Sequence, residues 1–182
     1  MDTRAKRIVE TAIELAESDG YAAVRLRDIA SRAGVALGTV YNRFKSKEEI
    51  LVAVMATEAE RIFASLRSQI EGATPVERAN NYFDRLTDVF LARPNLARAI
   101  LRSLVGDGDI AGQIGTLQEF ATSRLESAIE GPGCELDGAQ RTEIATMLQQ
   151  IWFALLIGWS SGLNDRASIR TQLDRAIRLV LA

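Results

Sequence analysis

The sequence lacks histidine altogether and contains one cysteine and three prolines among its 182 residues. Without histidine, a Ser-His-Asp triad and the common zinc sites are excluded. A single cysteine, Cys134, cannot form a disulfide within the chain or hold a metal with other cysteines. No pair of carboxylates stands at a recognisable catalytic spacing. We therefore expect no enzyme, no cofactor and no metal site.

Long hydrophobic runs are also missing. The longest nearly uncharged stretch, residues 147–163, is short for a membrane span and is interrupted by glutamines and serines. The N-terminus carries several charges and has no signal-peptide pattern. The hydrophobic fraction of 47% is sufficient for a core. Because neither a membrane span nor a signal peptide is visible, we expect a soluble cytoplasmic protein without a membrane partner.

Helical periodicity runs through the chain, with capping residues and loop signals between the periodic segments. No strand pattern, internal repeat or low-complexity tract is visible. The pattern predicts an all-α fold of nine helices, over residues 3–19, 27–33, 37–44, 47–70, 75–92, 95–105, 110–130, 138–162 and a last helix after Asp165. The helix that starts at Lys47 is long enough to contain a domain boundary.

Residues 25–47 have the pattern of a helix-turn-helix. Gly34 ends the first helix because glycine readily takes a positive φ, and Val35 fills the turn. In the second helix Val40 and Phe44 share a buried face, which leaves outward the side chains of Thr39, Tyr41, Asn42 and Arg43. Between residues 21 and 47 there are six cations and one carboxylate, in a chain of net charge −2. Such a local basic patch favours nucleic-acid contact.

This stretch resembles the DNA-binding domain of the tetracycline-repressor (TetR) family over residues 6–55. The resemblance is carried by Ile29-Ala30, Gly34-Val35, Gly38-Thr39-Val40-Tyr41, Phe44 and Lys47-Glu48. It implies a helix-turn-helix domain over residues 1–50, an all-helical ligand-binding and dimerisation domain over residues 51–182, and a double-stranded DNA operator as partner. The DNA-binding residues that we expect are Arg25, Arg27, Leu37, Gly38, Thr39, Tyr41, Asn42, Arg43 and Lys47.

The resemblance also assigns roles by position. Thr39, Tyr41 and Asn42 stand where family members contact bases and phosphates, and Lys47 stands where the family binds a phosphate. The family usually places Thr or Ser before the second helix and Ser before the third, whereas this chain has Arg25 and Ala36. Each helix is therefore expected to lack a side-chain cap, which stabilises a helix by about 1 kcal/mol.

Aromatic residues are concentrated in the C-terminal two thirds of the chain. Ordinary core packing accounts for any one of them, but their number favours an apolar pocket between helices. The pocket residues that we expect are Phe83, Leu86, Phe90, Leu101, Leu104, Leu117, Phe120, Trp152 and Phe153. Residues 96–102, with the Gly-Asp loop after them, are similar to lipid- or steroid-responsive members of the family. We therefore expect a small apolar or amphipathic effector.

The segment 138–162 is apolar on nearly its whole circumference. It is either a central core helix or a helix shared between two copies of the chain. A palindrome-reading protein needs two copies, which favours a homodimer. The interface residues that we expect are Met147, Ile151, Leu155, Gly158, Gly162, Leu173 and Ile177, with the two glycines allowing a close helix crossing.

These features together predict a ligand-responsive transcriptional regulator, with repression as the expected mode, that binds a palindromic operator as a homodimer. One alternative is a helical module that only dimerises or carries a ligand. Steep weakening with salt would distinguish operator binding from apolar ligand binding. An enzyme is the third alternative, and the missing histidines and unpaired carboxylates speak against it.

Overall fold

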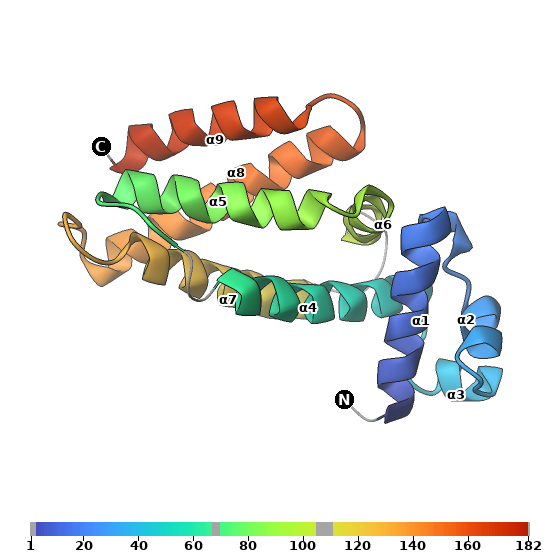
Figure 1. Ribbon diagram of the computed structural model, residues 1–182. Helices are drawn as coiled ribbons and strands as arrows, with labels where there is room; N and C mark the ends of the chain where they lie inside the picture. Colours follow the sequence, from blue (N-terminus) through green and yellow to red (C-terminus); the bar gives the residue numbers. More distant parts are fainter. Residues whose placement is uncertain (1–2, 67–69, 105–110, 182) are drawn as a thin grey trace. The chain divides into compact units, whose positions relative to one another are not determined.

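The structure is a computed structural model that describes residues 3–66, 70–104 and 111–181 (Figure 1). Within these residues no strand is present, and the all-α expectation is confirmed with nine α-helices and one short 3-10 helix. The elements are α1 Thr3–Asp19, η1 Tyr21–Ala23, α2 Leu26–Arg32, α3 Leu37–Tyr41, α4 Lys47–Leu66, α5 Pro75–Leu91, α6 Pro94–Leu104, α7 Ala111–Ile129, α8 Gly138–Ser160 and α9 Arg166–Leu181.

Contacts divide the chain into two compact units, one of residues 1–60 and 91–114, the other of residues 61–90 and 115–182. These units differ from a simple division at residue 50, because α6 packs with α1 and η1 in the first unit. Residues 1–50 as the DNA-binding domain and 51–182 as the ligand-binding and dimerisation domain stay a prediction. No helix of the described part is long and apolar enough to cross a membrane.

In the first unit, α1 is the central helix and contacts α2, η1 and α6. Its amphipathic pattern puts Ile8 and Ala12 on the inner face, where both are fully buried. Arg93, at the start of α6, forms ion pairs with the buried Glu58 of α4 and, at 3.5 Å, with Glu17 of α1. Two ion pairs thus link the start of α6 to α1 and α4, and α6 also packs on α1.

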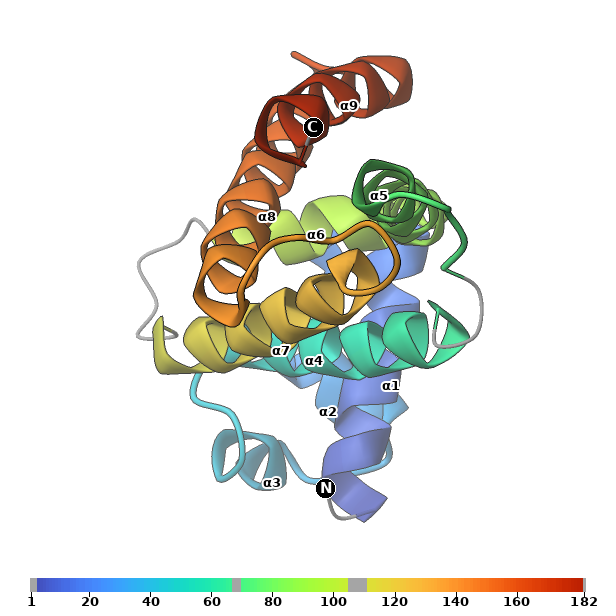
Figure 2. The same cartoon turned by 90° about the vertical axis from the view of Figure 1, so that its left-hand side faces the viewer.

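The second unit has its core on α5, α7, α8 and α9. Its largest fully buried side chains belong to Tyr82, Phe83, Leu125, Ile129, Leu148 and Leu156. Helices α8 and α9 form a hairpin (Figure 2). Along α9 the residues Ile169, Leu173 and Ile177 follow each other at four-residue spacing and are all buried.

The end of α8 explains why glycine stands at positions 158 and 162. Gly162, with φ 81°, follows the helix, and the amide of Leu163 donates to the carbonyl of Gly158 at 2.7 Å, which is a Schellman ending. The side chain of Asn164 folds over Gly158 and donates to the Leu155 carbonyl at 3.2 Å. A Cβ at position 158 would lie 2.3 Å from the Asn164 side-chain nitrogen. The turn after α8 within one copy of the chain thus accounts for both glycines. A close helix crossing between two copies, which their spacing suggests, is not needed to explain them.

Arg78 holds three segments of the second unit together. This residue of α5 is only 7% exposed. Its guanidinium donates to the carbonyls of Ala128 at 2.9 Å and Ile129 at 2.7 Å, in the last turn of α7, and to those of Gly72 and Pro132. Carbonyls at the end of a helix lack hydrogen-bond partners within the helix and carry partial negative charge. The buried Arg78 guanidinium supplies the missing donors and balances that charge.

We expect Arg78→Lys to lower the free energy of unfolding by about 2–4 kcal/mol, because an ammonium cannot reach four carbonyls as the flat guanidinium does. Urea denaturation followed by circular dichroism measures the change. Arg175→Met is the matched control, since Arg175 lies exposed on α9, and its effect should stay within about 0.5 kcal/mol. Equal stability of the two variants would contradict a structural role for Arg78.

Candidate nucleic-acid interface

The two helices of the expected helix-turn-helix are held by a small apolar core. Ile29 of α2 and Val40 of α3 are completely buried. In the turn between them Gly34 has φ 61°, and the amide of Val35 donates to the Ala30 carbonyl at 3.0 Å. The positive φ confirms why the first helix ends at this glycine.

Arg7 of α1 supports the same turn, although no sequence pattern points to it. Its guanidinium donates to the carbonyl of Ala33 and, at 3.3 Å, to that of Gly34. These are carbonyls at the end of α2, where a cation is favourable. The helix-turn-helix pattern is the only sequence signal for this region, and it does not include Arg7. Nothing in the pattern predicts that a residue of the first helix binds carbonyls 26 and 27 positions later in the chain.

Helix α3 is shorter than expected. It ends at Tyr41 rather than at residue 44, because the amide of Arg43 donates to Val40, three residues back, and the chain tightens into a turn. Asn42 and Arg43 therefore lie beyond the helix. The expected lack of caps is confirmed, since Arg25 and Ala36 have extended backbone and make no side-chain capping bond.

Most of the predicted DNA-binding residues are at the surface. Tyr41 is 55% exposed. Arg25, Arg27, Gly38, Asn42 and Arg43 are exposed as well, whereas Leu37, Thr39 and Lys47 are half-buried. No protein atom lies within 4 Å of a Cβ built on Gly38. The protein's own packing thus leaves that position open, as a close approach of DNA requires.

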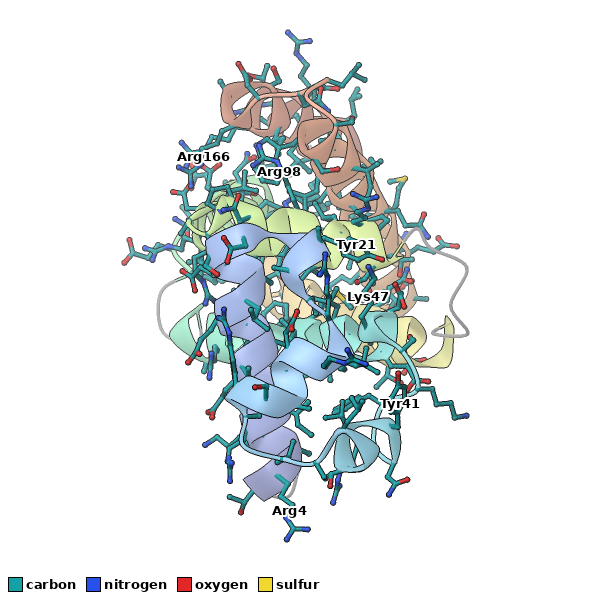
Figure 3. The ribbon with its side chains drawn as sticks, turned by 90° about the vertical axis from the view of Figure 1, so that its right-hand side faces the viewer. Arg4, Tyr21, Tyr41, Lys47, Arg98 and Arg166 are labelled. Atoms are coloured by element: carbon teal, nitrogen blue, oxygen red, sulfur yellow. The ribbon has the colours of Figure 1, made fainter. Side chains whose placement is uncertain are left out.

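Lys47 is the first residue of α4, and its side chain packs on the aromatic ring of Tyr21. Its ammonium lies 3.8 Å from the ring centroid of Tyr21, while the Tyr21 hydroxyl donates to the carboxylate of Glu48 at 2.6 Å (Figure 3). Burial, followed by the hydrogen bond to Glu48, raises the pKa of Tyr21 to about 12. Figure 3 shows Tyr41 on α3, apart from Tyr21 and Lys47.

The first turn of α4 is capped by Ser46, whose hydroxyl accepts from the amide of Glu49 at 3.2 Å. The Glu49 carboxylate reaches back to the amide of Lys45 at 2.6 Å, one residue earlier than in the usual capping box. The start of the helix at Lys47, expected from this spacing, is confirmed.

The predicted pocket residues fall into separate groups. Trp152 contacts Phe83 and Phe90, with ring centroids 6.3 and 5.9 Å apart, and its indole nitrogen donates to Thr87 at 2.9 Å. Leu86 is buried nearby on α5, whereas Phe153 is 37% exposed. Phe120 packs on Phe63, with ring centroids 5.3 Å apart. Leu101 and Leu104 belong to the first unit, and the side chain of Leu117 lies outside the described residues.

The predicted dimer residues are also divided by their burial. Leu155, Leu173 and Ile177 are buried within one copy of the chain, because α8 and α9 pack on each other. They offer no surface to a partner. Met147 is 39% exposed and Ile151 is half-buried, and on α9 the exposed apolar side chain is Leu179, at 85%. Within the described residues no group of three His, Cys, Asp or Glu side chains is arranged to hold a metal ion.

Comparison with known proteins gives matches over nearly the whole chain. Residues 8–54 match the family model of bacterial regulatory proteins, tetR family, and residues 72–180 match a tetracyclin repressor-like C-terminal domain. The HTH-type transcriptional repressor KstR of Mycolicibacterium smegmatis is 32% identical over 181 residues, which cover 98% of this chain and 87% of that protein.

Two solved structures extend the comparison. A TetR transcriptional regulator from Rhodococcus sp. RHA1 aligns with a TM-score of 0.84 and 29% identity, over 98% of this chain and 96% of that one. Thermus thermophilus FadR, a TetR-family transcriptional repressor solved in complex with lauroyl-CoA, aligns with a TM-score of 0.70 and 19% identity, over 97% and 93%. At that lower identity the likeness concerns the fold alone.

We expect Tyr41→Ala and Lys47→Ala each to weaken binding of a duplex operator by about 10- to 100-fold, because one removes an exposed contact and the other a phosphate partner. Fluorescence anisotropy with a labelled duplex measures the affinity, and thermal unfolding checks the fold. Val89→Ala serves as the control, since Val89 is likewise an exposed apolar residue, on α5. Unchanged affinity in either variant would remove that residue from the interface.

Proposed function

Because this chain belongs to the TetR family of bacterial regulatory proteins, we propose that it represses transcription as a homodimer on a palindromic operator, under the control of an amphipathic effector. Family and relatives make it a ligand-responsive transcriptional repressor rather than an enzyme. We propose further that the repressor is cytoplasmic and homodimeric, that its operator is symmetric and that its effector is amphipathic.

One observation carries the DNA-binding part: an acidic chain has exposed arginines at the start of α2 and in the turn after α3. Arg25, Arg27 and Arg43 are all exposed, as is Tyr41, and the position of Gly38 is open. Cations that neutralise phosphates supply affinity and position the protein, while the side chains on α3 contact the base edges. A dimer would place its two α3 helices in successive major grooves, about 34–36 Å apart.

The effector part is supported by the aromatic group in the second unit. Phe83, Phe90 and Trp152 meet there, and the Trp152 indole donates to the buried Thr87; the buried Gln149 donates to the Tyr82 hydroxyl. An apolar wall with a few polar groups fits a ligand that has an apolar body and a polar end. The lauroyl-CoA bound by the Thermus thermophilus repressor is such a molecule. Long-chain acyl-CoA thioesters are therefore the probes of choice.

Release from DNA requires that the effector prefers the state that does not bind DNA. To move the protein from 99% to 1% of the DNA-binding state, the affinity ratio must be about 10,000-fold, or about 5.5 kcal/mol. One covalent connection available for this coupling is α4, which starts at Lys47 and belongs to the first unit up to Glu60 and to the second from Arg61.

Selection from a random duplex library should yield a palindromic sequence, because two symmetry-related α3 helices contact equivalent half-sites. Adding lauroyl-CoA to the complex should lower the apparent affinity by about tenfold or more. Lauric acid without CoA and CoA without an acyl chain are the controls for the two ends of the molecule. Selected duplexes without symmetry would contradict the homodimer, and an affinity insensitive to acyl-CoA would contradict this effector class.

A helical module that only carries a ligand is the other function to be tested, and salt distinguishes the two. Operator binding that neutralises several phosphates should weaken by about 10³-fold or more between 50 and 200 mM salt. Binding of an apolar ligand should change little over that range, because no counterions are released.

The exposed stripe of α8 supports the dimer. Met147, Ile151 and Ala154 recur at helical spacing and none of them is buried. We expect Ile151→Glu to shift the protein from dimer to monomer in analytical ultracentrifugation, since two copies of a buried carboxylate would face each other across a two-fold axis. Thr142→Glu, exposed on another side of α8, should leave the dimer intact. A dimer that survives Ile151→Glu would place the interface elsewhere.

A further inference from the structure

Tyr21 is surrounded by three charged side chains that come from two helices of the first unit. Its ring centroid lies 3.8 Å from the Lys47 ammonium at the start of α4 and 4.8 Å from the guanidinium carbon of Arg102 on α6. Its hydroxyl donates to the Glu48 carboxylate at 2.6 Å. Neither the motif nor the family comparison assigns a function to this arrangement.

The contacts on Tyr21 differ in kind and act on different neighbours. A cation over an aromatic face is attracted by the ring quadrupole, so the ring restrains the long Lys47 side chain. Arg102 contacts the same ring from α6, which keeps the ring from swinging away. The hydroxyl, in contrast, binds an ionised carboxylate, which is the stronger type of hydrogen bond.

The protonation states agree with this arrangement. The Tyr21 hydroxyl is protonated at neutral pH and can donate, because its pKa lies far above 7. Burial by itself raises the pKa of Glu48, but the hydrogen bonds from Tyr21, its own amide and Ser46, together with the nearby charge of Lys47, outweigh it and hold that pKa below its usual value. Glu48 is therefore an anion that needs a partner, and Tyr21 supplies one.

The neighbourhood of Lys47 shows why this matters for phosphate binding. Two carboxylates, Glu48 and Glu49, follow Lys47 directly at the N-terminus of α4. Glu49 is occupied by the Lys45 amide and Glu48 by the Tyr21 hydroxyl. If Glu48 were released, it would be free to pair with Lys47 or to repel an approaching phosphate. Both outcomes would weaken the contact expected of Lys47.

We propose that Tyr21 is a positioning residue for operator binding, whose ring holds the Lys47 ammonium and whose hydroxyl keeps the Glu48 carboxylate away from it. This rests on the proposed function, since Lys47 must contact a phosphate. Tyr21 itself does not contact DNA. Its two parts can be removed one at a time, which makes their effects separable.

The test is a set of affinities for the selected operator, measured on the full chain. Tyr21→Phe removes only the hydroxyl and should weaken binding by about threefold, whereas Tyr21→Leu also removes the ring and should weaken it by about tenfold. In Tyr21→Phe, the additional change Glu48→Gln should restore the affinity, because no carboxylate is then left to compete for Lys47. A purely structural role of the hydroxyl gives no such rescue.

A double-mutant cycle with Lys47→Met examines the ring. If the ring acts through Lys47, Tyr21→Leu should weaken binding by less than about twofold once Lys47→Met is present. Each of the two single variants should also reduce the slope of log affinity against log salt by about one, because one phosphate is no longer neutralised. Lys45→Met is the matched control, because it removes the same charge from the same segment. Its effect should multiply with that of Tyr21→Leu.

The outcomes separate this inference from the proposed function. Wild-type protein that binds no selected duplex overturns both. Wild-type binding combined with unchanged affinity in the Tyr21 variants overturns the inference alone. So does a Tyr21→Leu effect that multiplies with that of Lys47→Met, or a Tyr21→Phe effect that Glu48→Gln leaves unrepaired. Tyr21→Phe keeps the ring and its packing, so the test holds even if Tyr21→Leu unfolds.

Discussion

Helix α3 cannot form by itself, and this constraint governs the DNA-binding unit. It has five residues, from Leu37 to Tyr41, and no side-chain cap at Ala36. An isolated helix needs about 12–15 residues to be marginally stable, so α3 depends on burial of Val40 against the rest of the unit. The packing of α3 on α2 is therefore what gives the exposed Tyr41 its position. The same dependence explains why Arg7 of α1 binds the carbonyls of the turn.

Charge has two different functions in the molecule. Some cations satisfy buried groups of the fold, as the buried Arg78 does for the end of α7 and the half-buried Arg93 for the buried Glu58. Exposed pairs such as Arg170 with Asp84 contribute little to stability, because water screens them. The exposed arginines at the start of α2 and in the turn after α3 belong to the helix-turn-helix itself. They give an acidic chain one basic face, and this face is where an anionic polymer would bind.

The TetR family match and the proposed mechanism concern the same parts of the chain. Family models cover both the helix-turn-helix and the C-terminal region. The cluster of Tyr21, Lys47, Glu48 and Arg102 lies within the first unit and joins α6, η1 and the start of α4 through one aromatic ring. A residue that touches no DNA would thereby decide how well a DNA contact is made. In the second unit, the contacts of Trp152 with Phe83 and Phe90 support the proposal of an apolar effector.

The sequence by itself determined the all-α fold, the helix starts at Lys47 and Pro75, the turn at Gly34 and the missing caps at Arg25 and Ala36. These follow from local rules of periodicity, capping and backbone freedom, which act over a few residues. Only the tertiary structure decided that α3 stops at Tyr41, that Leu173 and Ile177 are buried within one copy, and that Gly158 makes room for Asn164. It alone brought Tyr21 to Lys47 and Arg7 to Ala33, because each pair is 26 residues apart in the chain and meets only when the helices pack.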